Sequence, residues 1–226
     1  YKRQAFGDAP TKLKYYRFME FDWDGVPLII SRTGWSSELG YEIFLRDGTQ
    51  GEKLWEHLMA VGGPLGLKPG HTSSIRRIEA GMLSYHADMT LANNPYEMGM
   101  GRLVDLDMEA DFISKAALTL IKERGVSQQL VGLEIDGAPF VGSNDFFWPV
   151  LKEGVKVGAV TSAIYSPRLQ KNIALAMISI DHTASGRVLQ VDKLSETRAC
   201  TVVPIPFYDP KNCLLYTSPS PRDLST

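Results

Sequence analysis

The chain has 226 residues, which is enough for one or two domains with a proper hydrophobic core. Its 24 Lys and Arg residues nearly balance its 26 Asp and Glu residues, so charge gives no reason to expect a nucleic-acid or membrane-surface partner. No apolar run approaches the length of a membrane span. Cys200 and Cys213 lie far apart without metal-ligand spacing, and the four histidines are scattered. These features predict a cytoplasmic protein without a disulfide framework or a metal site.

Two β-rich runs and a helix are predicted in the first part of the chain. Val26–Ser31 and Tyr41–Leu45 are rich in β-branched and aromatic residues, and a loop with two glycines joins them. Gly51–Gly62 follows as an amphipathic helix, because its apolar residues recur at helical spacing. We expect four of them on one side: Leu54, Trp55, Leu58 and Met59.

A second predicted helix, His71–Tyr85, carries a carboxylate on its apolar face. Thr72 or Ser73 is its expected N-cap. At about 100° per residue, Glu79 falls in the middle of the apolar face. That face is formed by Ile75, Ile78, Met82 and Leu83. A buried carboxylate needs a partner, since an unpaired buried charge costs several kcal/mol. The partner is either Arg76, three residues back, or a ligand that donates two hydrogen bonds, such as a pterin or guanine-like ring.

The loop that follows this helix is polar. Asp88 and Asn94 are expected to fix it through hydrogen bonds from backbone N–H groups to their side chains. A histidine beside an aspartate suggests acid–base chemistry, but His86 is better explained as a loop residue that replaces a permissive glycine. Glu97 is expected to be structural, or to stand behind the residues that contact a ligand.

The second part of the chain predicts a small antiparallel barrel or sandwich. A short helix in 111–125 ends at Gly125. From Gln128 onward, six short β-rich runs are separated by Gly, Pro, Asn and Asp. We therefore expect a first domain over 1–126, a β-barrel domain over 127–212, and an unstructured tail over 213–226. That tail is Ser/Thr/Pro-rich and without periodicity, and it is not expected to be native sequence.

Several blocks of this sequence, in the same order, resemble the glycine-cleavage T-protein family of tetrahydrofolate-dependent aminomethyl and methyl transferases. They are FDWDGVPLIISRTGWSSELGYEIFL, RIEAGMLSYHADMT followed by NNPYE, DFISKAAL, and VGAVTSAIYSPRLQKNIALAMI. The resemblance implies an α+β fold, in which part of a folate-binding α/β domain of the T-protein type precedes a small antiparallel β-barrel. It also implies that the family's catalytic acid lies in an N-terminal half that precedes this sequence, so the chain is expected to be an N-terminally truncated, inactive fragment.

The resemblance assigns roles to five residues. Glu79 matches the glutamate that the family gives to the pterin of tetrahydrofolate, and Tyr85 would line the folate pocket. Arg168 would approach the glutamate tail of the folate from the barrel. The residues alone leave open a core tyrosine and a surface arginine at these two positions. Trp35 and Tyr41 would bind substrate, and the Trp35 ring suits a cationic methyl donor, although Tyr41 is more simply a core residue.

The expected reaction is methyl transfer from a small-molecule donor to the folate. Trp35 and the blocks RTGWSSELGYEIFL and LSYHADMTLANNPYE resemble the dimethylsulfoniopropionate demethylase branch. Phe44 and the His86-Ala87 pair depart from that branch, so two alternatives stay open. One is a glycine-cleavage-type aminomethyltransferase, whose donor is held on a carrier protein. The other is a non-catalytic folate-binding protein of the same fold, for which the expected Cys motif is missing from the sequence.

Overall fold

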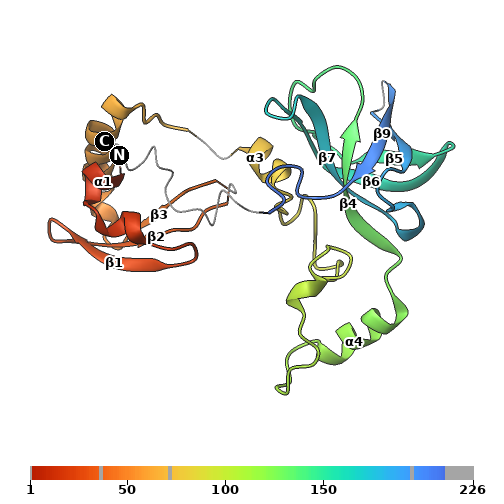
Figure 1. The fold of residues 1–226 in the computed structure, drawn as a ribbon, viewed down its shortest axis with the longest axis horizontal. Coiled ribbons are helices and arrows are strands. Elements are labelled where there is room, and N and C mark those ends of the chain that lie inside the picture. The colour runs from red at the N-terminus through yellow and green to blue at the C-terminus, as the bar shows by residue number, and fades with distance from the viewer. Residues whose placement is uncertain (1, 36–37, 71–72, 194–195, 212–226) are drawn as a thin grey trace. The chain divides into compact units, whose positions relative to one another are not determined.

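The computed structural model describes residues 2–35, 38–70, 73–193 and 196–211, and it divides into two compact units (Figure 1). One unit is Tyr1–Ser73 with Lys211–Thr226, and the other is Ser74–Pro210. His71, Thr72 and the predicted tail 213–226 lie outside the described residues. Within the described residues, no helix is both long enough and apolar enough to cross a membrane.

The first unit is an antiparallel sheet packed against helices. The sheet has the order β1-β2-β3, with β1 at Phe18–Trp23, β2 at Val26–Ser31 and β3 at Glu42–Leu45. Helices α1 (Lys2–Phe6) and α2 (Gly51–Gly62) accompany it, with short 3-10 turns η1 (Ala9–Lys12), η2 (Gly48–Gln50) and η3 (Gly63–Leu65). The predicted strands and helix are confirmed. The buried core is formed by Ala5, Phe6, Trp23, Val26, Leu28, Ile30 and Leu54.

Two details of this unit differ from the prediction. Trp55 is 53% exposed, so the buried side of α2 is narrower than its sequence pattern indicates. Strand β1 was not predicted, although its signal is present in the sequence. Asp24 and Gly25 both have positive φ and form the two-residue turn that joins β1 to β2, which is the Asp-Gly pattern typical of a tight hairpin.

Helix α3 (Ser74–Glu79) is much shorter than the predicted His71–Tyr85. Gly81 follows it at φ +65°, and its N–H donates to the carbonyl of Ile78 while the N–H of Met82 donates to the carbonyl of Arg77. This pair of bonds is a Schellman motif, in which a left-handed glycine ends a helix. The prediction was wrong because it followed the apolar spacing through Met82 and Leu83 and did not count Gly81 as a stop signal.

The rest of the second unit leads into a closed barrel. After η4 (Gly101–Leu103), helix α4 spans Lys115–Arg124 and ends at Gly125 as predicted. The barrel order is β4-β7-β6-β5-β8-β9, and every pair is antiparallel. Its strands are β4 (Gln128–Ile135), β5 (Trp148–Lys152), β6 (Val155–Ser166), β7 (Lys171–Ser179), β8 (Val188–Asp192) and β9 (Thr197–Val203), with η5 (Ile180–His182) after β7. Closure leaves no strand edge unpaired, and the predicted antiparallel barrel is confirmed.

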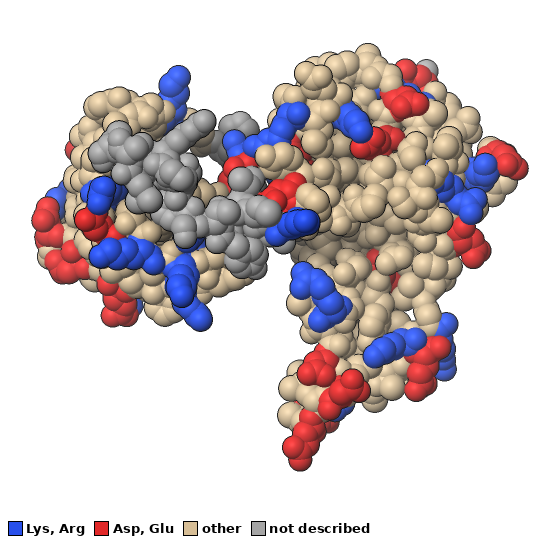
Figure 2. Space-filling view, in the orientation of Figure 1, with Lys and Arg blue, Asp and Glu red and all other residues tan. Residues whose placement is uncertain are grey.

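Charged side chains of both signs are interspersed on the face shown in Figure 2. This agrees with the near balance of acidic and basic residues in the sequence. On that face, the described residues of each unit carry Lys and Arg close to Asp and Glu. The electrostatic potentials of these opposite charges largely cancel nearby.

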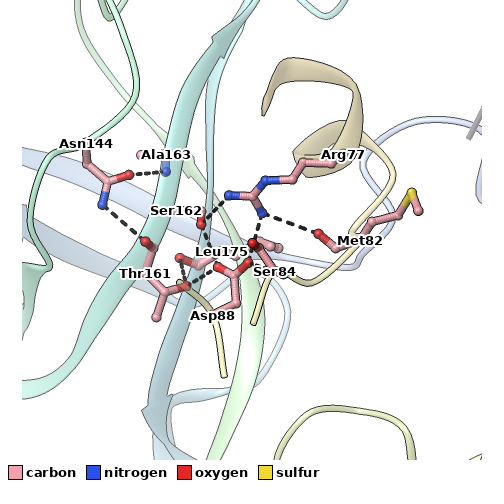
Figure 3. A network of polar contacts seen from close by, with 9 residues as sticks. All are labelled: Arg77, Met82, Ser84, Asp88, Asn144, Thr161, Ser162, Ala163 and Leu175. Carbon is pink, nitrogen blue, oxygen red and sulfur yellow. Dashed lines mark hydrogen bonds and ion pairs between the residues drawn. The ribbon is translucent and has the colours of Figure 1, made fainter. Parts of the chain in front are cut away.

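Strand β6 contains a bulge, and the side chain of Asn144, from another segment, hydrogen-bonds to the backbone there. The register between β6 and β7 shifts between Val160 and Ser162. Such a bulge leaves backbone groups without ladder partners. The Asn144 amide nitrogen donates to the Thr161 carbonyl at 3.2 Å, and its amide oxygen accepts from the Ala163 N–H at 2.6 Å (Figure 3). Asn144 therefore gives a hydrogen-bond partner to one backbone group of Thr161 and one of Ala163 at the irregular part of the strand.

The bulge directs two hydroxyl groups at one buried carboxylate. Successive residues of a regular strand point to opposite faces. Here the hydroxyls of Thr161 and Ser162 both donate to Oδ1 of Asp88, at 2.7 and 2.6 Å (Figure 3). Oδ2 of Asp88 accepts from Nη1 of Arg77 and from the backbone N–H of Ser84, each at 2.9 Å. The predicted bond from the loop backbone to Asp88 is present, but the same carboxylate also ties α3 to the barrel.

We predict that Asp88→Asn destabilises the second unit by roughly 3–5 kcal/mol, because it leaves the buried Arg77 guanidinium without its ion-pair partner. The side chains of this pair are only 10% and 0% exposed, so solvent cannot replace the lost interaction. Hydrogen exchange of the barrel amides would measure the change in this unit alone.

The matched control is Asp181→Asn, which removes the same charge from an exposed position of this unit. It should change stability by less than about 0.5 kcal/mol. Equal protection of the barrel amides in the two variants would contradict the role given to Asp88.

Candidate functional site

The candidate site is the carboxylate of Glu79 at the end of α3. The side chain is 4% exposed, which agrees with its predicted place on the apolar side of the helix. Its neighbour Ile78 is fully buried in a cluster with Met98, Leu130, Ile173 and Leu175. A carboxylate at such a place must be satisfied by nearby donors.

Two side chains of the β6–β7 hairpin approach this carboxylate. The hydroxyl of the fully buried Ser166 donates to Oε1, and Ser166 is itself fixed by the Leu169 N–H, which donates to its oxygen at 3.1 Å. Nη1 of Arg168 lies 3.7 Å from Oε2. That distance exceeds the hydrogen-bond range, so Oε2 keeps room for a further donor. The ionic partner that the structure gives to Glu79 is thus Arg168 from the barrel, whereas the predicted alternative, Arg76, is exposed.

An aromatic ring completes this group. The N–H of Tyr208, in the segment after β9, donates to the Glu79 carbonyl at 3.0 Å. The Arg168 guanidinium carbon lies 4.1 Å from the centre of the Tyr208 ring. The segment passes close to the helix end, because a Cβ at Gly81 would lie 3.3 Å from Cβ of Ile205. Glu79, Ser166, Arg168 and Tyr208, which we call the Glu79 cluster, therefore come from three separate segments of one unit.

Tyr85 and His86 lie beyond the end of α3. Tyr85 is 48% exposed, and its ring centre is 4.3 Å from that of His86. The N–H of His86 donates to the Met89 carbonyl within the same loop. His86 has φ +71°, which is the left-handed backbone expected where a histidine replaces a glycine. The role of Tyr85 in a folate pocket stays a prediction.

Asn94 and Glu97 hold the next turn of the loop. Oδ1 of Asn94 accepts from the N–H groups of Tyr96 and Glu97, at 3.0 and 3.1 Å, as predicted for a side chain that fixes a loop. Glu97 is 8% exposed, and its carboxylate accepts from the Asn94 N–H and from the Gln128 amide, each at 3.3 Å. These contacts give Glu97 a structural role.

Trp35 and Tyr41 belong to the first unit and are described within it. Trp35 lies in the loop between β2 and β3 and is 48% exposed. Tyr41 packs partly buried against the core of that unit, and Nζ of Lys2 lies 4.1 Å from its ring centre. Burial raises the pKa of the Tyr41 phenol above its usual value. This placement suits a core tyrosine, and the predicted substrate contacts of both residues stay predictions.

The chemistry available at the Glu79 cluster is recognition by hydrogen bonding. Cys200, inside the barrel, has its pKa raised to about 12 by burial, so it is no thiolate nucleophile at neutral pH. In the described part of the chain, no group of three His, Cys, Asp or Glu side chains gathers as metal ligands do. The cluster offers a carboxylate held by Ser166 and an aromatic ring that shares the Arg168 guanidinium with it. A carboxylate of this kind can accept from a flat ring with adjacent N–H donors.

Sequence reasoning missed three residues that build this region: Arg77, Ser166 and Tyr208. Arg77 carries the buried pair on α3, while its neighbour Arg76 is exposed. Adjacent arginines on a short helix carry no signal that tells the buried one from the exposed one. Ser166 and Tyr208 reach Glu79 only because the barrel folds, and no local spacing shows such a contact.

The comparisons with known proteins agree in outline. Residues 4–108 match the family model of the GCVT N-terminal domain, and residues 128–209 match that of the glycine cleavage T-protein C-terminal barrel domain. A solved structure of the glycine cleavage system aminomethyltransferase T from Bartonella henselae superposes with a TM-score of 0.76. That match has 21% sequence identity and covers 89% of this chain and 56% of the other, so it supports the fold alone.

Curated relatives are more similar in sequence. Dimethylsulfoniopropionate demethylase DmdA of Ruegeria pomeroyi is 36% identical over 199 residues, which cover 88% of this chain and 54% of the relative. An aminomethyltransferase of Streptomyces avermitilis is 37% identical over 204 residues, which cover 87% of this chain and 53% of the relative. The chain thus spans about half the length of the curated relatives that it matches. With both family models in order along its two parts, the chain belongs to the glycine-cleavage T-protein family.

Proposed function

We propose that this chain provides the pterin-binding face of a tetrahydrofolate-dependent methyltransferase that acts on a sulfonium donor of the dimethylsulfoniopropionate kind. The observation that carries the proposal is the buried Glu79 carboxylate, whose Oε2 lies 3.7 Å from Nη1 of Arg168, beyond hydrogen-bond range. Family membership supports the same reaction class, since the relatives include a demethylase and aminomethyltransferases.

The donor set at the cluster fits the edge of a pterin. That edge presents a ring N–H next to an exocyclic amine, and a carboxylate accepts such a pair in bidentate fashion. Ser166 uses one lone pair of Oε1, which leaves acceptor positions on both oxygens. A flat ring in this position also needs an aromatic or apolar face to pack on, and the Tyr208 ring stacks on the same Arg168 guanidinium that faces the carboxylate.

In this proposal the protein acts by positioning. Bound tetrahydrofolate would supply the nitrogen that accepts the methyl group. Glu79 fixes the orientation of the ring in its plane, and Ser166 fixes the rotamer of Glu79. Arg168, 35% exposed, is the residue that we propose for the glutamate tail, and Tyr85 for the pocket wall. Trp35, and with it Tyr41, is proposed on the donor side, where the indole ring would hold a cation by cation–π attraction.

The sulfonium branch suits these residues because a sulfonium carries its own leaving group. In the transfer, the S–CH3 bond breaks and an N–CH3 bond forms, the sulfur becomes a neutral thioether, and the proton of the accepting nitrogen passes to solvent. The step therefore needs alignment and a water-poor cation site more than a proton donor. The competing proposal is aminomethyl transfer from a carrier protein. The aminomethyltransferase from Streptomyces avermitilis has nearly the same sequence identity to this chain as the demethylase, so sequence identity does not decide between the two donors.

We predict that Glu79→Gln in the full-length protein weakens tetrahydrofolate binding by roughly 10- to 100-fold, because an amide replaces one of the oxygens that accept from the ring. Calorimetric titration would measure the affinity, and a thermal melt would show that the fold is intact. The matched control is Glu134→Gln, which removes a carboxylate paired with Lys171 elsewhere on the barrel and should leave affinity unchanged. Unchanged affinity in Glu79→Gln would remove the pterin role.

We predict that Trp35→Ala mainly raises KM for dimethylsulfoniopropionate in the full-length protein, by roughly 5- to 30-fold, because it removes the aromatic face that holds the cation before methyl transfer. Trp55→Ala serves as control, since that ring is also about half exposed but lies on α2. Steady-state kinetics with both variants would decide the matter. Turnover of an aminomethylated carrier protein, with none of the sulfonium, would overturn the donor while leaving the folate proposal intact.

A further inference from the structure

Two arginine–carboxylate pairs each include a residue of α3, and they differ in distance and in exposure to solvent. Arg77 and Asp88 are 2.9 Å apart, with side chains 10% and 0% exposed. Arg168 and Glu79 are 3.7 Å apart, and the Arg168 side chain is 35% exposed. The first pair has hydrogen-bond geometry, whereas the second lacks it. Arg168 is therefore the arginine of the two whose contact with its carboxylate is the weaker.

The position of Arg168 resembles that of a bound ring edge. A guanidinium is flat, carries adjacent N–H donors and stacks on aromatic faces. Its carbon lies 4.1 Å from the centre of the Tyr208 ring, and Nη1 faces Glu79. The edge of a pterin contains the same N–C(–N)–N arrangement, with the same adjacent donors. Carboxylate and aromatic ring would recognise either group by the same contacts.

We propose that Arg168 is a built-in substitute for the guanidine edge of the pterin, and that Tyr208 is the stacking face that Arg168 and the ligand share. The inference rests on the proposed function, and it adds a competitor and a binding residue to the site. When the ligand arrives, the Arg168 side chain leaves Tyr208 and Glu79, and it is then available to the glutamate tail of a folate. Until then it keeps the buried Glu79 carboxylate next to a positive charge, which that carboxylate needs.

Competition between Arg168 and the ligand predicts the sign of the change in affinity when Arg168 is removed, and that sign is opposite to the one expected for a structural role. If Arg168 occupies the site for most of the time, the apparent dissociation constant is raised by the inverse of the fraction of open sites. Removal of Arg168 then tightens ligand binding. A residue that only supports the fold, or that only binds ligand, would weaken binding when it is removed.

The test uses 6-methyltetrahydropterin, which has no glutamate tail, so contacts between Arg168 and the tail cannot contribute. Calorimetric titration of the full-length protein should show Arg168→Ala binding this pterin more tightly than the unaltered protein, on the order of tenfold. Tyr208→Leu should bind more weakly, and Tyr208→Phe should retain affinity because it keeps the ring. Lys171→Ala is the matched control: it removes a positive charge from the same hairpin, but one that is paired with Glu134.

The outcomes separate this inference from the function on which it rests. Loss of pterin binding in Glu79→Gln together with tighter binding in Arg168→Ala supports both. Loss in Glu79→Gln with unchanged or weaker binding in Arg168→Ala overturns the inference and leaves the function standing. An equal gain in Lys171→Ala also overturns it, because the effect would then be one of net charge. Absence of pterin binding in every variant overturns the function and the inference together.

Discussion

The buried carboxylate of Asp88 is the interaction on which the second unit depends. It accepts hydrogen bonds from the α3 arginine Arg77, from the Ser84 N–H in the loop, and from the hydroxyls of Thr161 and Ser162 at the β6 bulge. These hydrogen bonds require a helix end, a loop and an irregular strand all to be held in place around one buried charge, and that ordering costs conformational entropy. In return, α3 is held against the barrel at a defined position, and with it Glu79.

The geometry of the Glu79 cluster depends on the hydrogen bonds to Asp88, because they fix the position of α3. With α3 held by Arg77, the carboxylate two residues further on, at the end of the short helix, meets Ser166 and Arg168 on the β6–β7 hairpin. The two ion pairs therefore have different tasks. The buried Arg77–Asp88 pair fixes the position of α3. The longer Arg168–Glu79 contact leaves the carboxylate able to exchange partners in the ligand site that we propose.

Much of this arrangement can be predicted from the sequence. Alternation and turn residues predict the barrel strands and the β2–β3 hairpin, and helical spacing singles out Glu79 as a buried acid. Local patterns fail where they compete, as when Gly81 ends a helix whose apolar spacing continues. They also fail for contacts made across the fold, because the donor hydroxyl of Ser166 lies 87 residues from Glu79. No periodicity encodes such a pair.

The same separation sets an order of events during synthesis of the chain. Glu79 leaves the ribosome long before Ser166 and Arg168, and Tyr208 follows the last barrel strand. Until the barrel closes, the Glu79 carboxylate is hydrated rather than held by Ser166 and Arg168, since these partners are either not yet synthesised or not yet in place. Closure of loops this long is slow compared with helix formation. The Glu79 cluster is thus the last part of the unit to be assembled, so that a polypeptide interrupted within the barrel has the glutamate but not the cluster.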